Sequence, residues 1–184
     1  MKIIVTGSLG HISLPLIKEL VQKGHEVVVI SSNADRQEAI EALGATAAIG
    51  SLEDVDFLTA TFTGADAVYC MVPPNNYFDH SLDLHAYYRR LGQNYAVAIA
   101  KSGVKRVVNL STIGAHLEKG SGILIGAHDL AEISDGLPAD VAITHMRPTS
   151  FYYNLYSYLP MIKNQGVIAT NYGYGDIVPL GFAN

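Results

Sequence analysis

Residues 1–30, MKIIVTGSLGHISLPLIKELVQKGHEVVVI, contain the pattern that decides the fold. The apolar run at 2–5 predicts a buried strand, and a glycine-bearing turn follows it at 6–13. Apolar residues then recur at helical spacing over 14–23, and the glycine after them provides the stop that often ends a helix. A second strand is expected at 26–30. Strand, turn, helix and strand form a βαβ unit, whose crossover is right-handed.

The turn between the first strand and the helix is the first candidate site. A helix N-terminus has unpaired N–H groups and a partial positive charge, so an anion such as a pyrophosphate binds well there. Gly7 permits the tight turn, and Gly10 lets the backbone approach a phosphate with no side chain in the way. Ser13 stands where the stricter dinucleotide pattern has a third glycine. We expect a nucleotide here; the alternative is a tight turn without a ligand.

The composition limits the class of protein. Of the 184 residues, 49% are hydrophobic and 16% charged, which is typical of a well-packed globular domain. The net charge of −5 offers no basic surface, so no nucleic-acid partner is expected. The single cysteine, Cys70, excludes an internal disulfide and favours a reducing, cytoplasmic location. The N-terminus lacks a signal-peptide pattern, and no apolar run reaches membrane-spanning length, so no membrane association is expected.

Strands and helices alternate along most of the chain. Beyond the first unit, strands are expected at 46–49, 67–72, 106–110 and 141–144, and helices at 37–43, 53–62, 81–102 and 128–134, with glycine-rich loop from 114 to 126. This alternation predicts an α/β fold with a Rossmann-type, doubly wound parallel sheet and helices on both faces.

The last part of the chain has a different composition. Tyrosine is dense at 151–158 and recurs at 172–175. An aromatic cluster near the carboxyl edge of the sheet can line a pocket for a flat substrate. The alternative, which does not exclude the first, is an amphipathic lid helix packed on the core.

Four stretches occur in an order typical of one family. They are VTGSLG at 5–10, GSL at 50–52, GVKRVV at 103–108 with LST at 110–112, and MRP at 146–148. With them the chain resembles the short-chain dehydrogenase/reductase superfamily, in its atypical NmrA-like branch, which includes NAD(P)H-dependent quinone oxidoreductases. The resemblance covers nearly the whole chain.

The resemblance implies a nucleotide across the carboxyl ends of the strands, as in open parallel sheets generally. The implied contacts are Gly7, Leu9, Gly10, His11 and Ile12 at the pyrophosphate, Ser51 and Leu52 at the adenine, and Val72, Pro73 and Pro74 at the nicotinamide ribose. Relatives usually have Asp at the position of Ser51. The implied domains are an NAD(P)-binding Rossmann domain at 1–150 and, at 151–184, the start of a substrate or lid region. Relatives continue beyond 177–179, where this chain soon stops, so we expect that region to be incomplete.

The end of the second strand bears on the choice of cofactor. NAD-specific sites carry Asp or Glu about 20 residues beyond the glycine turn, to accept from the ribose 2′-OH. Here that place holds Ser31, Ser32 and Asn33, which do not repel a 2′-phosphate. Arg36 can offer a 2′-phosphate a charge-assisted contact, although Asp35 can pair with Arg36 or replace the missing acid. The stretch can instead be only an N-capping loop. We expect NADP(H) to be favoured over NAD(H).

The candidate catalytic residues depart from the superfamily pattern. Members that reduce carbonyls use a Tyr and a Lys four residues apart, and this chain has His128 and Glu132 at the matching place. A Glu cannot assist the proton donor as the Lys does, so the usual carbonyl-reductase mechanism is not expected. His128 is predicted to border the acceptor and donate to its oxygen; the alternative is a helix-start histidine facing solvent. Ser111 matches the substrate-polarising serine, or merely holds the nicotinamide or caps a turn.

These features predict an NAD(P)H-dependent oxidoreductase that transfers hydride from NADPH to a quinone or a similar small-molecule acceptor. A quinone needs less acid catalysis than a ketone, because its reduced form is an aromatic diol. The alternative is a non-catalytic NADP(H)-binding redox sensor, for which the Tyr and Lys are equally dispensable. The sequence leaves the natural acceptor and the oligomeric state open.

Three further groups of residues were assigned structural roles. The 7 histidines show no ligand spacing, so no metal site is expected. Cys70, inside an apolar strand, is expected to be a buried small hydrophobe. Residues 87–90, Tyr-Tyr-Arg-Arg, are expected to be a solvated helix face, with a partner contact as the alternative.

Overall fold

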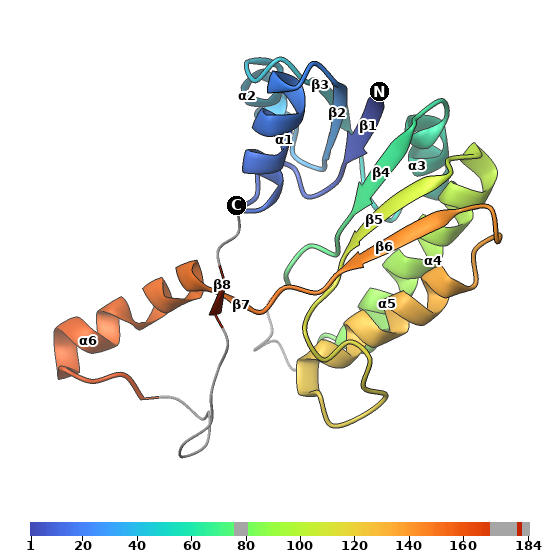
Figure 1. Ribbon diagram of the computed structural model, residues 1–184. Helices are drawn as coiled ribbons and strands as arrows, with labels where there is room; N and C mark the ends of the chain where they lie inside the picture. Colours follow the sequence, from blue (N-terminus) through green and yellow to red (C-terminus); the bar gives the residue numbers. More distant parts are fainter. Residues whose placement is uncertain (76–80, 170–179, 182–184) are drawn as a thin grey trace. The chain divides into compact units, whose positions relative to one another are not determined.

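Six parallel strands form the central sheet of the protein, in the order β3-β2-β1-β4-β5-β6 (Figure 1). They are β1 (Lys2–Val5), β2 (Glu26–Ser31), β3 (Thr46–Ile49), β4 (Ala67–Cys70), β5 (Arg106–Leu110) and β6 (Ala142–Met146). The strand order reverses between β1 and β4, and open α/β sheets bind their ligands at such a point. The predicted Rossmann-type fold is confirmed.

The computed structural model describes residues 1–75, 81–169 and 180–181. Contacts along the chain divide it into two units, Met1–Arg147 and Pro148–Asn184. The first unit contains the sheet and its helices. No described helix is long and apolar enough to cross a membrane.

Helices cover the sheet from two sides. One layer contains α1 (Ser13–Gln22) and α2 (Gln37–Glu41), and the other contains α3 (Val55–Phe62), α4 (Leu84–Ser102) and α5 (Ile125–Asp135) (Figure 1). Short 3₁₀ turns, η1 (Ala34–Arg36) and η2 (Gly122–Leu124), precede α2 and α5. Because parallel strands are buried on both faces, they appear in the sequence as continuous apolar runs.

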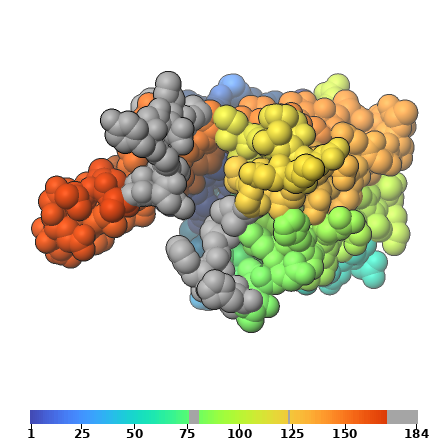
Figure 2. Space-filling model, turned by 90° about the horizontal axis from the view of Figure 1, so that it is seen from below, coloured from blue at the N-terminus to red at the C-terminus, as the bar shows by residue number. Residues whose placement is uncertain are grey.

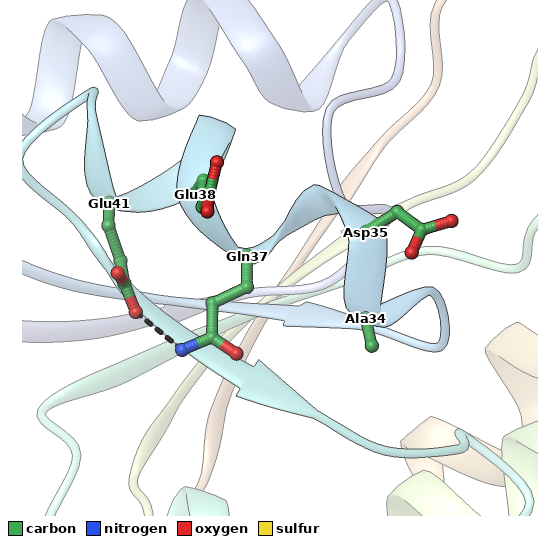
Figure 3. Close-up of a pocket in the computed structure, with 5 residues that line it drawn as sticks. All are labelled: Ala34, Asp35, Gln37, Glu38 and Glu41. Carbon is green, nitrogen blue, oxygen red and sulfur yellow. Dashed lines mark hydrogen bonds between the residues drawn. The ribbon is translucent and has the colours of Figure 1, made fainter.

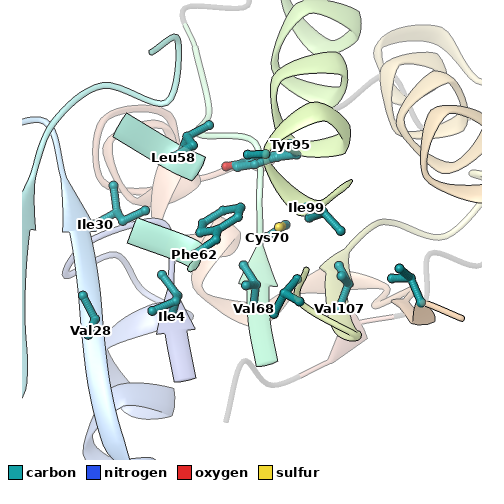
Figure 4. Packing of buried hydrophobic residues seen from close by; sticks show 13 residues of the cluster. Ile4, Val28, Ile30, Leu58, Phe62, Val68, Cys70, Tyr95, Ile99 and Val107 are labelled. Atoms are coloured by element: carbon teal, nitrogen blue, oxygen red, sulfur yellow. The ribbon is translucent and has the colours of Figure 1, made fainter. Parts of the chain in front are cut away.

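The core is split by the sheet into two apolar clusters. Ile4, Val28 and Val68 point to the α3–α4 side, where they meet Phe62 and Tyr95 (Figure 4). Their chain neighbours point to the α1–α2 side and pack around Ile17 and Ile40, which are fully buried. Because successive side chains of a strand point to opposite faces of the sheet, each strand contributes side chains to both apolar clusters.

Several element boundaries differ from the sequence prediction, each for a local reason. β4 ends at Cys70 and not at 72, because the Met71 N–H donates to Thr6 Oγ1 (2.9 Å) and leaves the ladder. α4 begins at Leu84 and not at 81, because the Asp83 carboxylate caps it through the Ala86 N–H (2.9 Å). β6 runs from Ala142 to Met146 and is thus shifted beyond the predicted 141–144.

The start of α5 was predicted wrongly. The helix begins at Ile125, so Gly126 is helical and not part of a loop, and His128 is not at the helix start. The reason is a close crossing with α4, which lies beside α5 (Figures 1 and 2). A Cβ on Gly126 would lie 2.5 Å from Tyr88 Cγ, and one on Gly92 would lie 2.7 Å from Leu130 Cδ1. The two glycines let the helices approach.

Gly126→Ala is therefore expected to destabilise the fold by about 1–3 kcal/mol, because the added methyl overpacks the crossing against the base of the Tyr88 ring. Urea unfolding measures the effect. In a Tyr88→Ala background, the same change should cost much less, since the ring that it meets is gone. An equal loss in both backgrounds would show that the crossing is not the cause. Lys101→Ala, at an exposed position near the end of α4, is the control.

The second unit contains the tyrosine-rich segment. It has a short parallel pair, β7 (Ser150–Phe151) with β8 (Leu180–Gly181), then a 3₁₀ segment, η3 (Tyr152–Tyr158), and α6 (Leu159–Gln165). The rings of Phe151 and Tyr153 stack with centroids 5.4 Å apart. The tyrosines and glycines at 172–175 and the stretch 177–179 lie outside the described residues. Whether this unit lines a pocket or acts as a lid stays a prediction.

Candidate functional site

The glycine turn between β1 and α1 is closed by short contacts. The Gly10 N–H donates to the Gly7 carbonyl (3.1 Å), and Gly7 has a φ of 87°, which favours glycine. A Cβ on Gly7 would lie 2.6 Å from Ser13 Oγ, and one on Gly10 would lie 3.0 Å from the Gly7 oxygen. Ser13 is buried and donates to the Thr6 carbonyl (2.9 Å). A hydroxyl thus joins helix to strand where the stricter pattern has its third glycine.

The N-terminus of α1 has no side-chain cap. Its N-cap residue, Ile12, makes no capping hydrogen bond, and its first turn contains no acidic residue. The neighbouring α3 and α4 are instead capped by the carboxylates of Asp54 and Asp83. The side chains of Leu9 and Ile12 pack inward against the α1–α2 core cluster. The start of α1 therefore presents backbone to the carboxyl edge of the sheet, as an anion site requires.

Arg36 reaches back from the end of β2 to the glycine turn. Its Nη1 donates to Ser8 Oγ at 3.2 Å, although 28 residues separate the two. Ser8 has a φ of 51°, which is uncommon for a residue other than glycine and which strained functional turns often contain. In the part of the chain that the structure describes, no ion pair joins Arg36 to Asp35. The guanidinium is thus held beside the turn by a neutral partner.

The loop after β2 is partly a capping loop. Asn33 Oδ1 accepts from the Asp35 N–H (2.9 Å) and so caps η1, as the alternative prediction held. The buried Ser31 hydroxyl donates to the Asn33 carbonyl (3.1 Å) and accepts from the Asn33 N–H (3.2 Å), so it is turned into the loop. Ser32 and Arg36 are exposed. Among the predicted groups in this loop, Arg36 is the one that the fold directs at the turn.

Three carboxylates lie along η1 and α2, close to Arg36 in the chain. A shallow surface depression is lined by Ala34, Asp35, Gln37, Glu38 and Glu41 (Figure 3). Gln37 Nε2 donates to Glu41 Oε1 at 2.9 Å across it. Three carboxylates within seven residues of chain create a negative field next to Arg36. That field opposes the attraction of Arg36 for a phosphate.

A buried hydroxyl, that of Ser111, follows the end of β5. Ser111 is 7% exposed, and its Oγ has no hydrogen-bond partner among the residues that the structure describes. Its N–H donates to the Met146 carbonyl (2.8 Å), which fixes the backbone between β5 and β6. An unsatisfied buried hydroxyl costs free energy, and a ligand group at this edge can satisfy it. Ser111 therefore fits a contact with a bound cofactor or acceptor.

The predicted ribose contacts after β4 divide into buried and exposed groups. Val72 is buried against Leu91 and Leu130, so its backbone, not its side chain, remains for a ligand. The Pro73 carbonyl accepts from the Tyr87 hydroxyl (3.4 Å), and Pro74 is exposed. Tyr87 and Tyr88 are half-buried beside this cluster, whereas Arg89 and Arg90 are exposed, so the solvated face predicted at 87–90 is correct for the arginines and wrong for the tyrosines.

His128 does not face solvent. Its ring is 15% exposed, which contradicts the alternative of a solvent-facing histidine. Nδ1 lies 3.0 Å from the Ala115 carbonyl, which only accepts, so Nδ1 carries the proton. Nε2 then faces Glu132 Oε1 at 3.6 Å and can donate to an acceptor oxygen only from the doubly protonated ring. The contact with Ala115 also makes His128 a support for the loop after β5.

We expect His128→Ala to lower turnover by about 10²-fold if the ring is a proton donor, while leaving cofactor affinity unchanged. His128→Asn is the matched variant, because its amide can still donate to the Ala115 carbonyl but has no group in place of Nε2. Steady-state kinetics with a quinone compares the two. Equal losses of turnover in His128→Ala and His128→Asn would support a catalytic role of the ring. Normal turnover in His128→Asn would show that His128 acts only by holding the loop after β5 through the Ala115 carbonyl.

Two other groups were assigned from the sequence alone. Burial raises the pKa of the Cys70 thiol, so Cys70 is not a thiolate nucleophile at neutral pH. No group of three or more potential metal ligands occurs among residues 1–75, 81–169 and 180–181. Sequence reasoning missed Asn94 and the ion pair of Arg90 with Glu53, both of which involve the loop after β3. Their spacing with Tyr87 places them on one face of a helix but does not indicate what that face contacts.

A glycine turn at an uncapped helix start, placed where the strand order reverses, defines a dinucleotide-binding protein of Rossmann type. The model of a family described as NAD(P)H-binding matches residues 7–133, so the chain belongs to the NAD(P)H-binding family. An uncharacterised protein of Schizosaccharomyces pombe is 37% identical over 68 residues, which make up 37% of this chain and 23% of that protein.

Solved structures share the fold at low identity. Triphenylmethane reductase of Citrobacter sp. superposes with a TM-score of 0.78 at 18% identity, over 94% of this chain and 58% of that one. An NADPH-dependent quinone oxidoreductase of Escherichia coli superposes with a TM-score of 0.73 at 19% identity, over 90% of this chain and 55% of that one. The chain thus spans little more than half the length of these two proteins.

Proposed function

We propose that this protein is an oxidoreductase that binds NADPH and transfers its hydride to a quinone or a similar small-molecule acceptor. The observation that carries the proposal is the set of unsatisfied groups at one edge of the sheet. In the described part of the chain, α1 starts there without a side-chain cap, and the Ser111 hydroxyl is buried there without a hydrogen-bond partner. Both groups fit a dinucleotide that lies across the carboxyl ends of β1, β4 and β5.

The residues present match the parts of such a cofactor. The glycine turn offers backbone N–H groups to the pyrophosphate, and Arg36 offers a cation to a 2′-phosphate. Ser111 can donate to the nicotinamide amide or to the acceptor. The cofactor supplies the hydride, and the protein binds and orients it.

The acceptor is proposed from chemistry and from the named relatives. His128 and Glu132 stand in place of the Tyr and Lys that carbonyl reduction uses, and a quinone depends less on that pair. Structural neighbours include a triphenylmethane reductase solved with NADP(H) and a quinone oxidoreductase solved with NADPH. Flat conjugated acceptors of this kind are the substrates that we propose.

The test is the loss of NADPH absorbance in the presence of a panel of quinones and triphenylmethane dyes. We expect turnover with at least one flat acceptor, and none without protein. Tight NADPH binding without turnover on any acceptor would contradict the oxidoreductase proposal and would support the non-catalytic sensor. Failure to bind NADPH or NADH would overturn both.

A further inference from the structure

One face of α4 donates hydrogen bonds to two loops at the carboxyl edge of the sheet. Asn94 Nδ2 donates to the Leu52 carbonyl (3.1 Å), and the Arg90 guanidinium makes two bonds to the Glu53 carboxylate (3.1 and 3.0 Å). On the same face, the Tyr95 hydroxyl donates to the Met71 carbonyl (2.7 Å). Positions 87, 90, 91, 94 and 95 share one side of a helix because of their three- and four-residue spacing.

The two loops lie on opposite sides of the glycine turn. The loop at 50–54 follows β3, and the loop at 71–75 follows β4, while β1 lies between β2 and β4 in the sheet. A dinucleotide with its pyrophosphate at the β1–α1 turn extends one half over β2 and β3. That is the adenosine half, because the ribose contact of such folds comes from the end of β2. The nicotinamide half extends over β4 and β5.

The loop at 50–54 is anchored at its start, where the Gly50 N–H donates to the Ser31 carbonyl at the end of β2 (3.0 Å), and is shaped further along by bonds within itself. The Glu53 N–H donates to Ser51 Oγ (3.1 Å), and the Asp54 N–H donates to the Ser51 carbonyl (3.1 Å). The internal bonds set the turn and the Gly50 bond fixes its first residue beside β2, whereas Leu52 and Glu53 are held from α4. The Arg90–Glu53 pair is half exposed on both sides, so by itself it contributes little. Asn94 is half-buried and donates to a backbone carbonyl, so it constrains the loop more strongly.

We propose that Asn94, assisted by the Arg90–Glu53 pair, is a positioning residue for the adenosine half of the cofactor. It holds the 50–54 loop at the distance from β2 that an adenine needs. Tyr95 does the same for the 71–75 loop and so for the nicotinamide half. The proposal rests on one part of the proposed function, namely that the ligand is a dinucleotide.

The test separates the two halves of the ligand. Asn94→Asp is close to isosteric, but it places a carboxylate against the Leu52 carbonyl, so the loop is released. We expect the Kd for NADPH and for ADP-ribose to rise about tenfold, which equals about 1.4 kcal/mol, with the affinity for reduced nicotinamide mononucleotide unchanged. Tyr95→Phe should give the opposite pattern. Gln93→Glu makes the same change of charge at an exposed neighbour and is the matched control.

A second pair of variants uses exposed residues whose replacement does not threaten the fold. Arg90→Glu alone places two carboxylates together and should weaken ADP-ribose binding, whereas Arg90→Glu with Glu53→Arg should restore it. Equal losses on both ligand halves, or no loss in Asn94→Asp, would overturn the proposal. If the wild type binds neither NADPH nor ADP-ribose, the proposed function fails first, and the two failures are thereby distinguished.

Discussion

Gly10→Asp is expected to abolish dinucleotide binding, with a rise in Kd of more than about 100-fold. The added Cβ would lie 3.0 Å from the Gly7 carbonyl oxygen, so that oxygen must shift by a few tenths of an ångström. The carboxylate would then face the pyrophosphate at the start of α1. Two unit charges of like sign 4 Å apart repel by about 1 kcal/mol in water and by about 4 kcal/mol near a protein surface. Titration of NADPH by fluorescence measures the loss.

Gly10→Asn separates bulk from charge, because it has nearly the same size without the carboxylate. We expect it to bind NADPH more weakly than wild type but clearly better than Gly10→Asp. The two variants should have the same unfolding midpoint in urea, since the turn is at the surface edge of the sheet. Unchanged cofactor affinity in a folded Gly10→Asp variant would refute the assignment of the glycine turn to the pyrophosphate.

The sheet was predictable because its strands are buried on both faces. The strands at 26–30 and 106–110 are found where the sequence indicates, since all but their first side chains are buried or half-buried in the layers on either side. Boundaries were less predictable where a contact distant in the chain decides them. β4 ends early because Thr6 takes the Met71 N–H. α5 starts early because Gly126 lies against Tyr88 on another helix.

The candidate site also contains one part that the sequence predicts and another that depends on contacts between distant residues. The glycine turn follows from local pattern, because turn, helix start and strand are adjacent in sequence. The bond from Arg36 to Ser8 joins residues 28 apart, and that from Asn94 to Leu52 joins residues 42 apart. The periodicity of the sequence does not predict such pairs, since they depend on how the loops approach one another at the carboxyl edge of the sheet. The orientation of His128 depends likewise on the Ala115 carbonyl, 13 residues away.

Arg36→Ala is expected to weaken NADPH binding by about 10-fold to 100-fold while leaving NADH nearly unchanged. A hydrogen bond to a charged group contributes about 1.5–3 kcal/mol, and only NADPH has the 2′-phosphate that would accept it. Ser8 Oγ holds the guanidinium at the turn, so no large rearrangement is needed for the contact. Direct titration of both reduced cofactors into wild type and variant measures the difference.

Ser8→Ala is the matched variant for this last prediction, because it removes the anchor of Arg36 and keeps the charge. Its loss of NADPH affinity should be smaller than that of Arg36→Ala. Glu38→Gln should raise NADPH affinity slightly, because it removes one of the carboxylates near Arg36. The preference for NADPH should also shrink as salt is added, since exposed charges are screened. Equal loss of NADPH and NADH in Arg36→Ala, or tighter NADH binding in the wild type, would show that Arg36 does not select the 2′-phosphate.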